Sequence, residues 1–261
     1  MPILQTATIR TYYEVSGQGD TLVFIHGHGS SSRDWEFQSA FFSEYFQTLC
    51  YDVRGHGKSE KPKGPYSVAG FATDLAELLG ALEIKMAHIV GLSMGGWIAF
   101  QFAVDYPEMT KSLTIVNSWA DMRPKNFQDR INIFQRFIYF RLFSMRKIGE
   151  IVAPIIFIKP EQDDLRQSLI ERWAENQKAS YFASMKAGIR WSVTDQLENI
   201  NCPVLVVAAD EDYTPVAAKQ AYVDKLPNAR LIVIEDSRHG TPVEHPEKFN
   251  RLLLGFLQEI A

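Results

Sequence analysis

The sequence predicts an α/β protein in which a mainly parallel central sheet is covered by helices on both faces. Short apolar runs suited to buried strands alternate with longer segments of helical periodicity. The length of 261 residues suits one α/β domain that carries an inserted subdomain. Several apolar runs also end in polar or glycine-rich loops, where open α/β sheets place their sites.

The first third of the chain predicts three strands and two helices. Residues 8–15 and 21–25 are rich in strand-forming residues and flank a glycine-containing turn, so we expect them to form a hairpin at the edge of the sheet. An aromatic-rich helix follows, and then a strand over residues 47–51. Residues 68–82 place phenylalanine and leucine on one side of a further helix.

The stretch from Ala87 to Ala103 is expected to turn from a buried strand into a helix around the pattern G-x-S-x-G, with Ser93 at its centre. A strand that turns sharply into a helix strains the backbone at the serine, and the two glycines relieve the crowding. Such a turn exposes the hydroxyl at the positive end of the helix. Ser93 is therefore the candidate nucleophile.

A strand over residues 112–117 is followed by a long segment of helical pattern without convincing strand alternation. We expect residues 119–199 to form a helical cap (lid). The remaining residues, 1–118 and 200–261, are expected to form the core.

Residues 131–149 of the expected cap interleave arginines with aromatic side chains, a pattern that suits contact with a membrane or with an acyl chain. Arg136 and Arg141 are turned about 140° from each other on a helix, so they do not form a single basic face. This favours an amphipathic lid whose aromatic residues shape a hydrophobic pocket. The candidate pocket residues are Trp119, Phe137 and Phe140, and core packing is an equal interpretation for Trp119.

The core resumes with a buried strand over residues 202–209 and a helix over 216–226. A strand over 229–234 and a last helix over 246–260 follow. This regular alternation favours parallel pairing of the strands.

Acyl transfer by a serine needs a base that removes the serine proton and a carboxylate that orients the base. Ser93, Asp212 and His239 occur in the chain order that a nucleophile elbow requires, each just beyond a different expected strand. We therefore expect these three side chains to be catalytic.

The loop after residues 21–25 contains two glycines that let it turn tightly beside the expected nucleophile. The backbone amides of His28 and Met94 are the candidate oxyanion hole. A metal site at His26 and His28 is the alternative, but two histidines on a loop without a nearby cysteine favour a role in shaping the loop. We expect neither a metal nor a cofactor.

Five stretches resemble the α/β-hydrolase fold superfamily, and the resemblance covers nearly all of the chain outside the expected cap. They are residues 26–29, 52–59, 91–96, 212–215 and 237–239. The family's acid lies three residues before a proline, which implies Asp212 rather than Asp210 or Glu211. The family's histidine lies in the loop after the last strand, which implies His239 rather than His245.

The resemblance is nearest to small esterases, enol-lactonases and related hydrolases with a helical lid. It implies a hydrolase that cleaves a carboxylic ester, a lactone or a thioester through an acyl-enzyme intermediate. Other enzymes that this fold implies are a perhydrolase or cofactor-free haloperoxidase, a carbon–carbon bond hydrolase, and an iminopeptidase with acidic lid residues such as Glu161, Asp163 and Asp164. The alternative without catalysis is a ligand-binding protein derived from a hydrolase.

The net charge of −4 exerts no long-range attraction on nucleic acid or on an anionic membrane, so the expected partner is a small ester-type molecule. Cys50 and Cys202 each adjoin an apolar run, which favours buried thiols over a disulfide. The N-terminus lacks the pattern of a signal peptide, and no apolar run approaches the about 20 residues that span a bilayer. We expect a soluble cytoplasmic protein without stable membrane insertion. The oligomeric state is not predicted.

Overall fold

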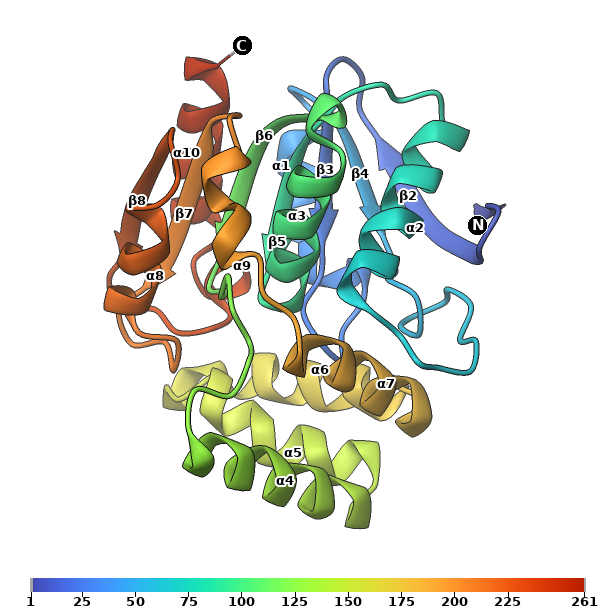
Figure 1. Cartoon of the computed structure of the whole chain (residues 1–261), viewed down its shortest axis with the longest axis vertical. Helices are drawn as coiled ribbons and strands as arrows, with labels where there is room; N and C mark the ends of the chain where they lie inside the picture. The colour runs from blue at the N-terminus through green and yellow to red at the C-terminus, as the bar shows by residue number, and fades with distance from the viewer. Residues whose placement is uncertain (1, 261) are drawn as a thin grey trace.

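Eight strands form one sheet in the computed structural model, which describes residues 2–260 (Figure 1). Their order across the sheet is β1-β2-β4-β3-β5-β6-β7-β8. The strands are β1 (Ile3–Gln5), β2 (Arg10–Ser16), β3 (Thr21–Ile25), β4 (Gln47–Tyr51), β5 (Ala87–Leu92), β6 (Thr110–Val116), β7 (Val204–Ala209) and β8 (Ala229–Ile234). All neighbouring pairs from β4 to β8 are parallel, whereas β2 pairs antiparallel with β1 and β4. The expected mainly parallel sheet is confirmed.

The expected hairpin between the second and third strands is wrong. Strand β2 pairs with β4, with Val15 opposite Leu49, and β4 separates β2 from β3. All five residues of β3 are buried, and β3 is hydrogen-bonded to strands on both sides, β4 and β5. Strand β2 exposes both Arg10 and Glu14, which suits a position near the edge.

Helices cover both faces of the sheet, as expected for this class. One face packs against α2 (Val68–Ala81), α3 (Met94–Asp105) and α8 (Val216–Val223), and the other against α1 (Glu36–Phe42) and α10 (Pro246–Glu259). Strand β3 shows how the faces separate, because Val23 and Ile25 belong to the first apolar cluster and Leu22 and Phe24 to the second. A short helix, α9 (Thr241–Glu244), precedes α10.

Four helices lie between β6 and β7 and gather at one end of the sheet (Figure 1). They are α4 (Phe127–Leu142), α5 (Met145–Ile156), α6 (Asp163–Ala174) and α7 (Lys178–Ile189), called here the helical insertion. The insertion has an apolar cluster of its own, built from Phe140, Met145, Ile148, Trp173 and Tyr181.

Shorter elements join these parts of the chain. The 3-10 helices are η1 (Ser32–Trp35), η2 (Pro107–Met109), η3 (Pro160–Gln162) and η4 (Thr194–Asn199). Among residues 2–260, no helix has both the length and the apolar character that crossing a bilayer requires. Both cysteines are free thiols; Cys50 is buried, whereas Cys202 is partly exposed.

Candidate active site

Ser93 lies at the turn between β5 and α3 and lines two cavities. Its backbone has φ 54° and ψ −112°, a conformation that residues with a side chain rarely adopt. A Cβ atom on Gly91 would lie 2.2 Å from the carbonyl oxygen of Gly95, and one on Gly95 would lie 2.2 Å from that of Ile25. Glycine is therefore required at both positions. The turn places Ser93 at the N-terminus of α3, whose partial positive charge favours a developing negative charge.

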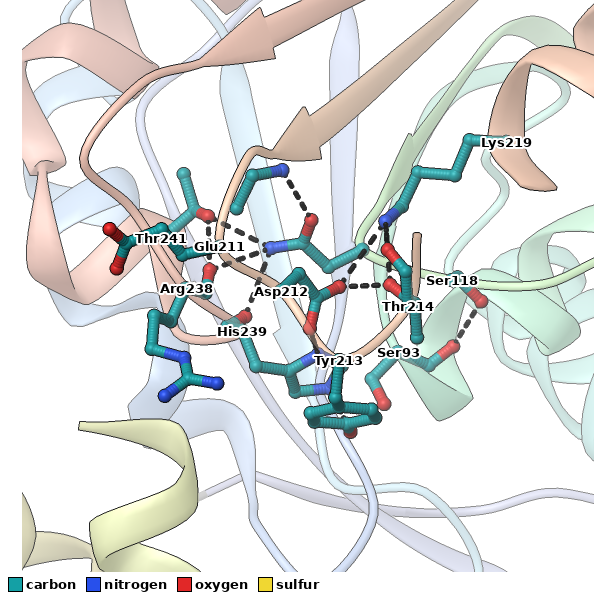
Figure 2. Close-up of polar contacts among 12 residues, drawn as sticks. Ser93, Ser118, Glu211, Asp212, Tyr213, Thr214, Lys219, Arg238, His239 and Thr241 are labelled. Atoms are coloured by element: carbon teal, nitrogen blue, oxygen red, sulfur yellow. Dashed lines mark hydrogen bonds and ion pairs between the residues drawn. The ribbon is translucent and has the colours of Figure 1, made fainter. Parts of the chain in front are cut away.

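Asp212 and His239 come from the loops after β7 and β8 and are hydrogen-bonded to each other (Figure 2). Nδ1 of His239 lies 2.9 Å from Oδ1 of Asp212, and both side chains are buried. Because an ionised carboxylate only accepts hydrogen bonds, the proton of a neutral His239 lies on Nδ1. Nε2 is then an acceptor, which is the state that a general base requires.

A buried cation, Lys219 of α8, contacts Asp212 from the other side (Figure 2). Its Nζ lies 3.3 Å from Oδ2 of Asp212, and neither side chain is exposed to solvent. Lys219 also donates to the hydroxyl of Thr214 (2.6 Å), which itself donates to the Asp212 carboxylate. Burial acts to raise the pKa of Asp212, but the hydrogen bond from His239 and the charge of Lys219 are among the effects that lower it below its ordinary value. The sequence analysis missed Lys219, whose only signal is a lone lysine in an alanine-containing helix just after the expected acid.

Asn117, directly after β6, joins the loops that carry the candidate acid and histidine. Its side-chain nitrogen donates to the carbonyls of Arg238 (3.1 Å) and His239 (3.2 Å). The same nitrogen donates to the hydroxyl of Thr241 (2.8 Å), and the side-chain oxygen accepts from the amide of Ala209 (2.8 Å). Asn117 is fully buried and has φ 44°, a region that asparagine tolerates better than most residues. An asparagine at a strand end is the signal that could have identified it.

The hydroxyl of Tyr213 contacts the other ring nitrogen of His239. Its oxygen lies 2.8 Å from Nε2, so the phenol donates to the nitrogen that the Asp212 contact leaves as an acceptor. The two rings are stacked with centroids 4.4 Å apart, and Tyr213 lies beside Ser93 and His239 in Figure 2. Just over half of the Tyr213 surface, 52%, is exposed to solvent. Within residues 2–260 no direct hydrogen bond joins Ser93 to His239. The sequence analysis gave Tyr213 no role.

The two amides expected to form an oxyanion hole lie next to Ser93 along the chain or in space. Met94 directly follows the serine, and His28 lines both cavities together with it. In the described part of the chain, neither backbone N–H has a hydrogen-bond acceptor. The neighbouring N–H of Gly27 instead donates to Asp34 (3.4 Å). Two N–H groups without partners beside a serine are available to an oxyanion.

Helix α7 of the insertion holds the side chain of His28. Nε2 of His28 lies 3.0 Å from the carbonyl oxygen of Tyr181 and 3.0 Å from the hydroxyl of Ser184. The imidazole also stacks on the ring of Tyr181, with centroids 4.1 Å apart. Burial lowers the pKa of His28 to about 3, although the hydrogen bond to Tyr181 opposes this shift. His28 is therefore neutral at neutral pH.

His26, the other histidine of this loop, uses both ring nitrogens within the fold. Nδ1 lies 2.7 Å from the carbonyl oxygen of Gly27, and Nε2 accepts from the amide of Val53 (3.0 Å). These contacts give His26 a role in shaping the loop. Across residues 2–260, no three or more histidine, cysteine, aspartate or glutamate side chains are grouped so that they could bind a metal ion.

Two cavities meet at Ser93, with volumes of about 190 and 160 Å³. Both are lined by His28, Ser93, Arg136, Tyr213 and His239. The larger cavity extends under the insertion, which contributes Val152, Ile156, Leu165, Leu169 and Trp173. The smaller cavity has mainly apolar walls, formed by Trp97, Trp119, Met122, Ile133, Phe137, Met185 and Ile189.

The three candidate pocket residues have different surroundings. Trp119 and Phe137 line the smaller cavity. Phe140 is not among the described residues that line either cavity. It packs instead with Ile148 and Tyr181 inside the insertion, because that small helical unit needs large side chains for a core of its own.

The acidic residues considered as alternatives, either to Asp212 or as the amine-binding groups of an iminopeptidase, lie outside the two cavities. Asp210 accepts from the amides of Asp236 and Ser237, each at 3.2 Å, and so organises the turn next to His239. The acidic residues Glu161, Asp163 and Asp164 are not among the described residues lining either cavity, and Asp163 pairs with Arg166. Neither cavity therefore obtains from them the acidic groups that an iminopeptidase would need.

Residues 22–252 match the model of a family described as the alpha/beta hydrolase family. The chain belongs to the alpha/beta hydrolase family. As a member of this family the protein is a hydrolase, and its eight-stranded sheet is the fold of the family.

Named relatives of this alpha/beta hydrolase match it over most of their length. A putative carbamate hydrolase RutD of Azorhizobium caulinodans is 28% identical over 268 residues, which cover 100% of this chain and 99% of the relative. The 3-oxoadipate enol-lactonase 2 of Acinetobacter baylyi is 30% identical over 245 residues, or 91% of this chain and 89% of the relative. The solved structure of a thermophilic esterase from Thermogutta terrifontis has a TM-score of 0.88 and 25% identity, with coverage of 99% and 97%.

Proposed function

We propose that this hydrolase cleaves a carboxylic ester, or a lactone or thioester, through an acyl-enzyme intermediate. Ser93 is the nucleophile, His239 the general base and acid, and Asp212 the carboxylate that orients His239. One observation carries the proposal: a strained Ser93 and a histidine held by a buried carboxylate line the junction of the same two cavities. An ester consists of an acyl group and an alcohol group, and two cavities that meet at the nucleophile can each hold one of these groups.

The first half of the reaction forms the acyl-enzyme. Oγ of Ser93 attacks the carbonyl carbon while Nε2 of His239 takes the serine proton, and the carbonyl oxygen becomes an oxyanion. The amides of Met94 and His28 stabilise this oxyanion, and removing one such donor typically costs about 10²- to 10³-fold in rate. The ester bond then breaks, and His239 returns the proton to the leaving alcohol.

The second half releases the acid. His239 takes a proton from water, whose oxygen attacks the acyl carbon bound to Ser93. The second tetrahedral intermediate collapses, the carboxylic acid leaves, and Oγ of Ser93 regains its proton from His239. Asp212 remains ionised and stabilises the imidazolium that forms in each half.

We also propose that residues 119–199 act as the cap (lid) of this site. Support comes from the five apolar side chains of α5 and α6 that line the larger cavity and from the contacts of α7 with His28. The names of two relatives, an enol-lactonase and an esterase, support an ester or lactone as the bond that is cleaved.

The test combines covalent labelling with turnover. We expect a fluorophosphonate probe to label Ser93 and the protein to hydrolyse 4-nitrophenyl esters of graded acyl length or a lactone. Ser93→Ala should abolish labelling and lower the hydrolysis rate on the order of 10⁶-fold. Retention of both in Ser93→Ala would refute the assignment.

Further assays separate the competing activities. Bromination that depends on peroxide and acetate, without ester hydrolysis, would favour a perhydrolase or haloperoxidase. Cleavage of a dienoic diketone without ester hydrolysis would favour a carbon–carbon bond hydrolase. Stabilisation by a ligand without any turnover would favour a binding protein.

A further inference from the structure

Arg136 extends from helix α4 towards the two cavities. A helix turns by about 100° per residue, so Arg136 lies about 200° around α4 from Phe134. Phe134 and Ile138 face solvent, with 64% and 48% of their surfaces exposed. Ile133 and Phe137 line the smaller cavity, and Arg136 lines both cavities. Arg136 is itself exposed to solvent in part of its surface, and its side chain reaches both cavities from the side of α4 opposite to Phe134.

The guanidinium group of Arg136 lies among aromatic rings and close to the candidate catalytic residues. Its central carbon lies 5.2 Å from the centroid of the Phe140 ring, a cation–π contact. Its charge acts on the ionisation of His28, Tyr181 and Tyr213, which surround the site. In the described part of the chain, Arg136 forms no ion pair with a carboxylate.

The carboxylates near the site have cations of their own. Asp34 and Glu36 line the larger cavity, and both pair with Arg172, at 3.7 and 2.9 Å. Asp212 pairs with the buried Lys219. Arg136 thus brings a positive charge to the place where the cavities meet, without a carboxylate of the described chain to balance it.

We infer that the substrate of this site carries a carboxylate, and that Arg136 binds this group where the two cavities meet. The inference rests on the proposed ester hydrolysis and specifies its substrate class as carboxylate-bearing esters or lactones. A guanidinium group matches a carboxylate with two parallel hydrogen bonds. One guanidinium group balances one negative charge, which favours a carboxylate over a doubly charged phosphate monoester.

The test measures preference for an anionic substrate over its neutral counterpart. Mono-4-nitrophenyl glutarate and 4-nitrophenyl pentanoate differ by a carboxylate on the acyl side, and 4-acetoxybenzoate and phenyl acetate differ by one on the alcohol side. We expect the wild type to prefer the anionic member of at least one pair in kcat/KM. Arg136→Gln should lower this preference about 10- to 100-fold, chiefly through KM, since hydrogen bonds to charged groups contribute about 1.5–3 kcal/mol. Arg136→Lys, which keeps the charge without the planar fork, should give an intermediate value.

Arg141→Gln is the matched control, because Arg141 lies on the same helix and is exposed like Arg136, but is not among the described residues lining either cavity. This variant should keep the wild-type preference. An equal preference of wild type and Arg136→Gln would overturn the inference, as would an equal loss in Arg141→Gln.

A binding measurement tests Arg136 independently of turnover. Glutarate should raise the melting temperature of Ser93→Ala, and the rise should disappear when Arg136→Gln is added. If glutarate does not stabilise the protein, or stabilises both variants equally, the carboxylate site is refuted. If glutarate binds through Arg136 but no ester is cleaved and no probe labels Ser93, the carboxylate site stands and the proposed hydrolysis fails.

Discussion

The hydroxyl oxygen of Tyr213 lies 2.8 Å from Nε2 of His239, the nitrogen that takes the serine proton in the proposed mechanism. Tyr213 therefore competes with Ser93 for the base as long as the site holds no substrate. A neutral hydrogen bond contributes about 0.5–1.5 kcal/mol, so substrate binding can displace the phenol from the nitrogen.

Tyr213→Phe removes this competition while it keeps the stacked ring. We expect fluorophosphonate labelling of Ser93 to become about 2- to 10-fold faster, which corresponds to the loss of one neutral hydrogen bond. The labelling rate is measured by quenching the reaction at successive times and reading the in-gel fluorescence of the probe. Tyr45→Phe is the control, because Tyr45 is not among the described residues lining either cavity, and it should label at the wild-type rate. Slower labelling of Tyr213→Phe would instead mean that the phenol passes the proton from serine to histidine.

Lys219→Met leaves the carboxylate of Asp212 buried without its cation. Breaking a buried ion pair in this way costs about 3–5 kcal/mol of the free energy of unfolding, measurable by urea denaturation. Loss of the cation also raises the pKa of Asp212, so the acid limb of the pH profile of kcat/KM should move to higher pH. Lys225→Met, at an exposed lysine just beyond α8, should change stability by no more than about 0.5 kcal/mol. An unchanged acid limb in Lys219→Met would contradict this role.

Gly95→Ala should destroy the turn at Ser93, because the new Cβ atom would lie 2.2 Å from the Ile25 carbonyl oxygen. We expect either no folded protein or a folded protein without probe labelling. Gly255→Ala is the opposite case, since a Cβ atom there meets nothing within 4 Å in the interior of α10. That variant should be more stable by about 0.5–1 kcal/mol. Normal labelling of Gly95→Ala would show that the turn tolerates a side chain.

Three histidines, His28, His56 and His88, make stability depend on pH, and the pKa of His28 is lowered by burial to about 3. Burial lowers the pKa of His88 to about 4 and that of His56 well below the ordinary value of 6.5. The unfolded chain therefore binds more protons than the folded one below pH 6.5, and stability is lost as the pH falls from 6.5 towards 4. Each histidine contributes up to about 1.4 kcal/mol per pH unit. Urea unfolding at pH 7.5, 6 and 5 should follow this slope, and His88→Asn should reduce it. An identical slope in that variant would contradict the prediction.

The sequence predicted those parts of the molecule that depend on local pattern. Ser93 could be located because its turn requires glycines at fixed positions, and Asp212 and His239 because each follows a strand. The partner of β2 could not be predicted, because strand alternation marks a buried face and carries no information on which strand lies beside it.

The side chains that surround the candidate residues were harder to predict. Arg136 was noticed only as one arginine of a basic, aromatic-rich segment, since its inward direction depends on how α4 is rotated against the core. Lys219 and Tyr213 face the site through loops and helix starts whose direction only the tertiary structure gives. Phe140 was predicted to line a pocket because it is a large aromatic residue on an amphipathic helix. The same property suits it to the core of the insertion, where it lies.

The contacts between His28 and helix α7 limit which insertion of a relative could replace the native one in an engineered chimera. The described hydrogen-bond partners of Asp212 and His239 lie outside residues 119–199, whereas the side chain of His28 is held by Tyr181 and Ser184 within them. A chimera with a foreign insertion would keep the proposed nucleophile, base and acid in position. It would nevertheless lose the contacts that support the loop of the proposed oxyanion amide. The chimera therefore needs an α7 that keeps the contacts to His28 if it is to gain a new substrate range at an unchanged rate of hydrolysis.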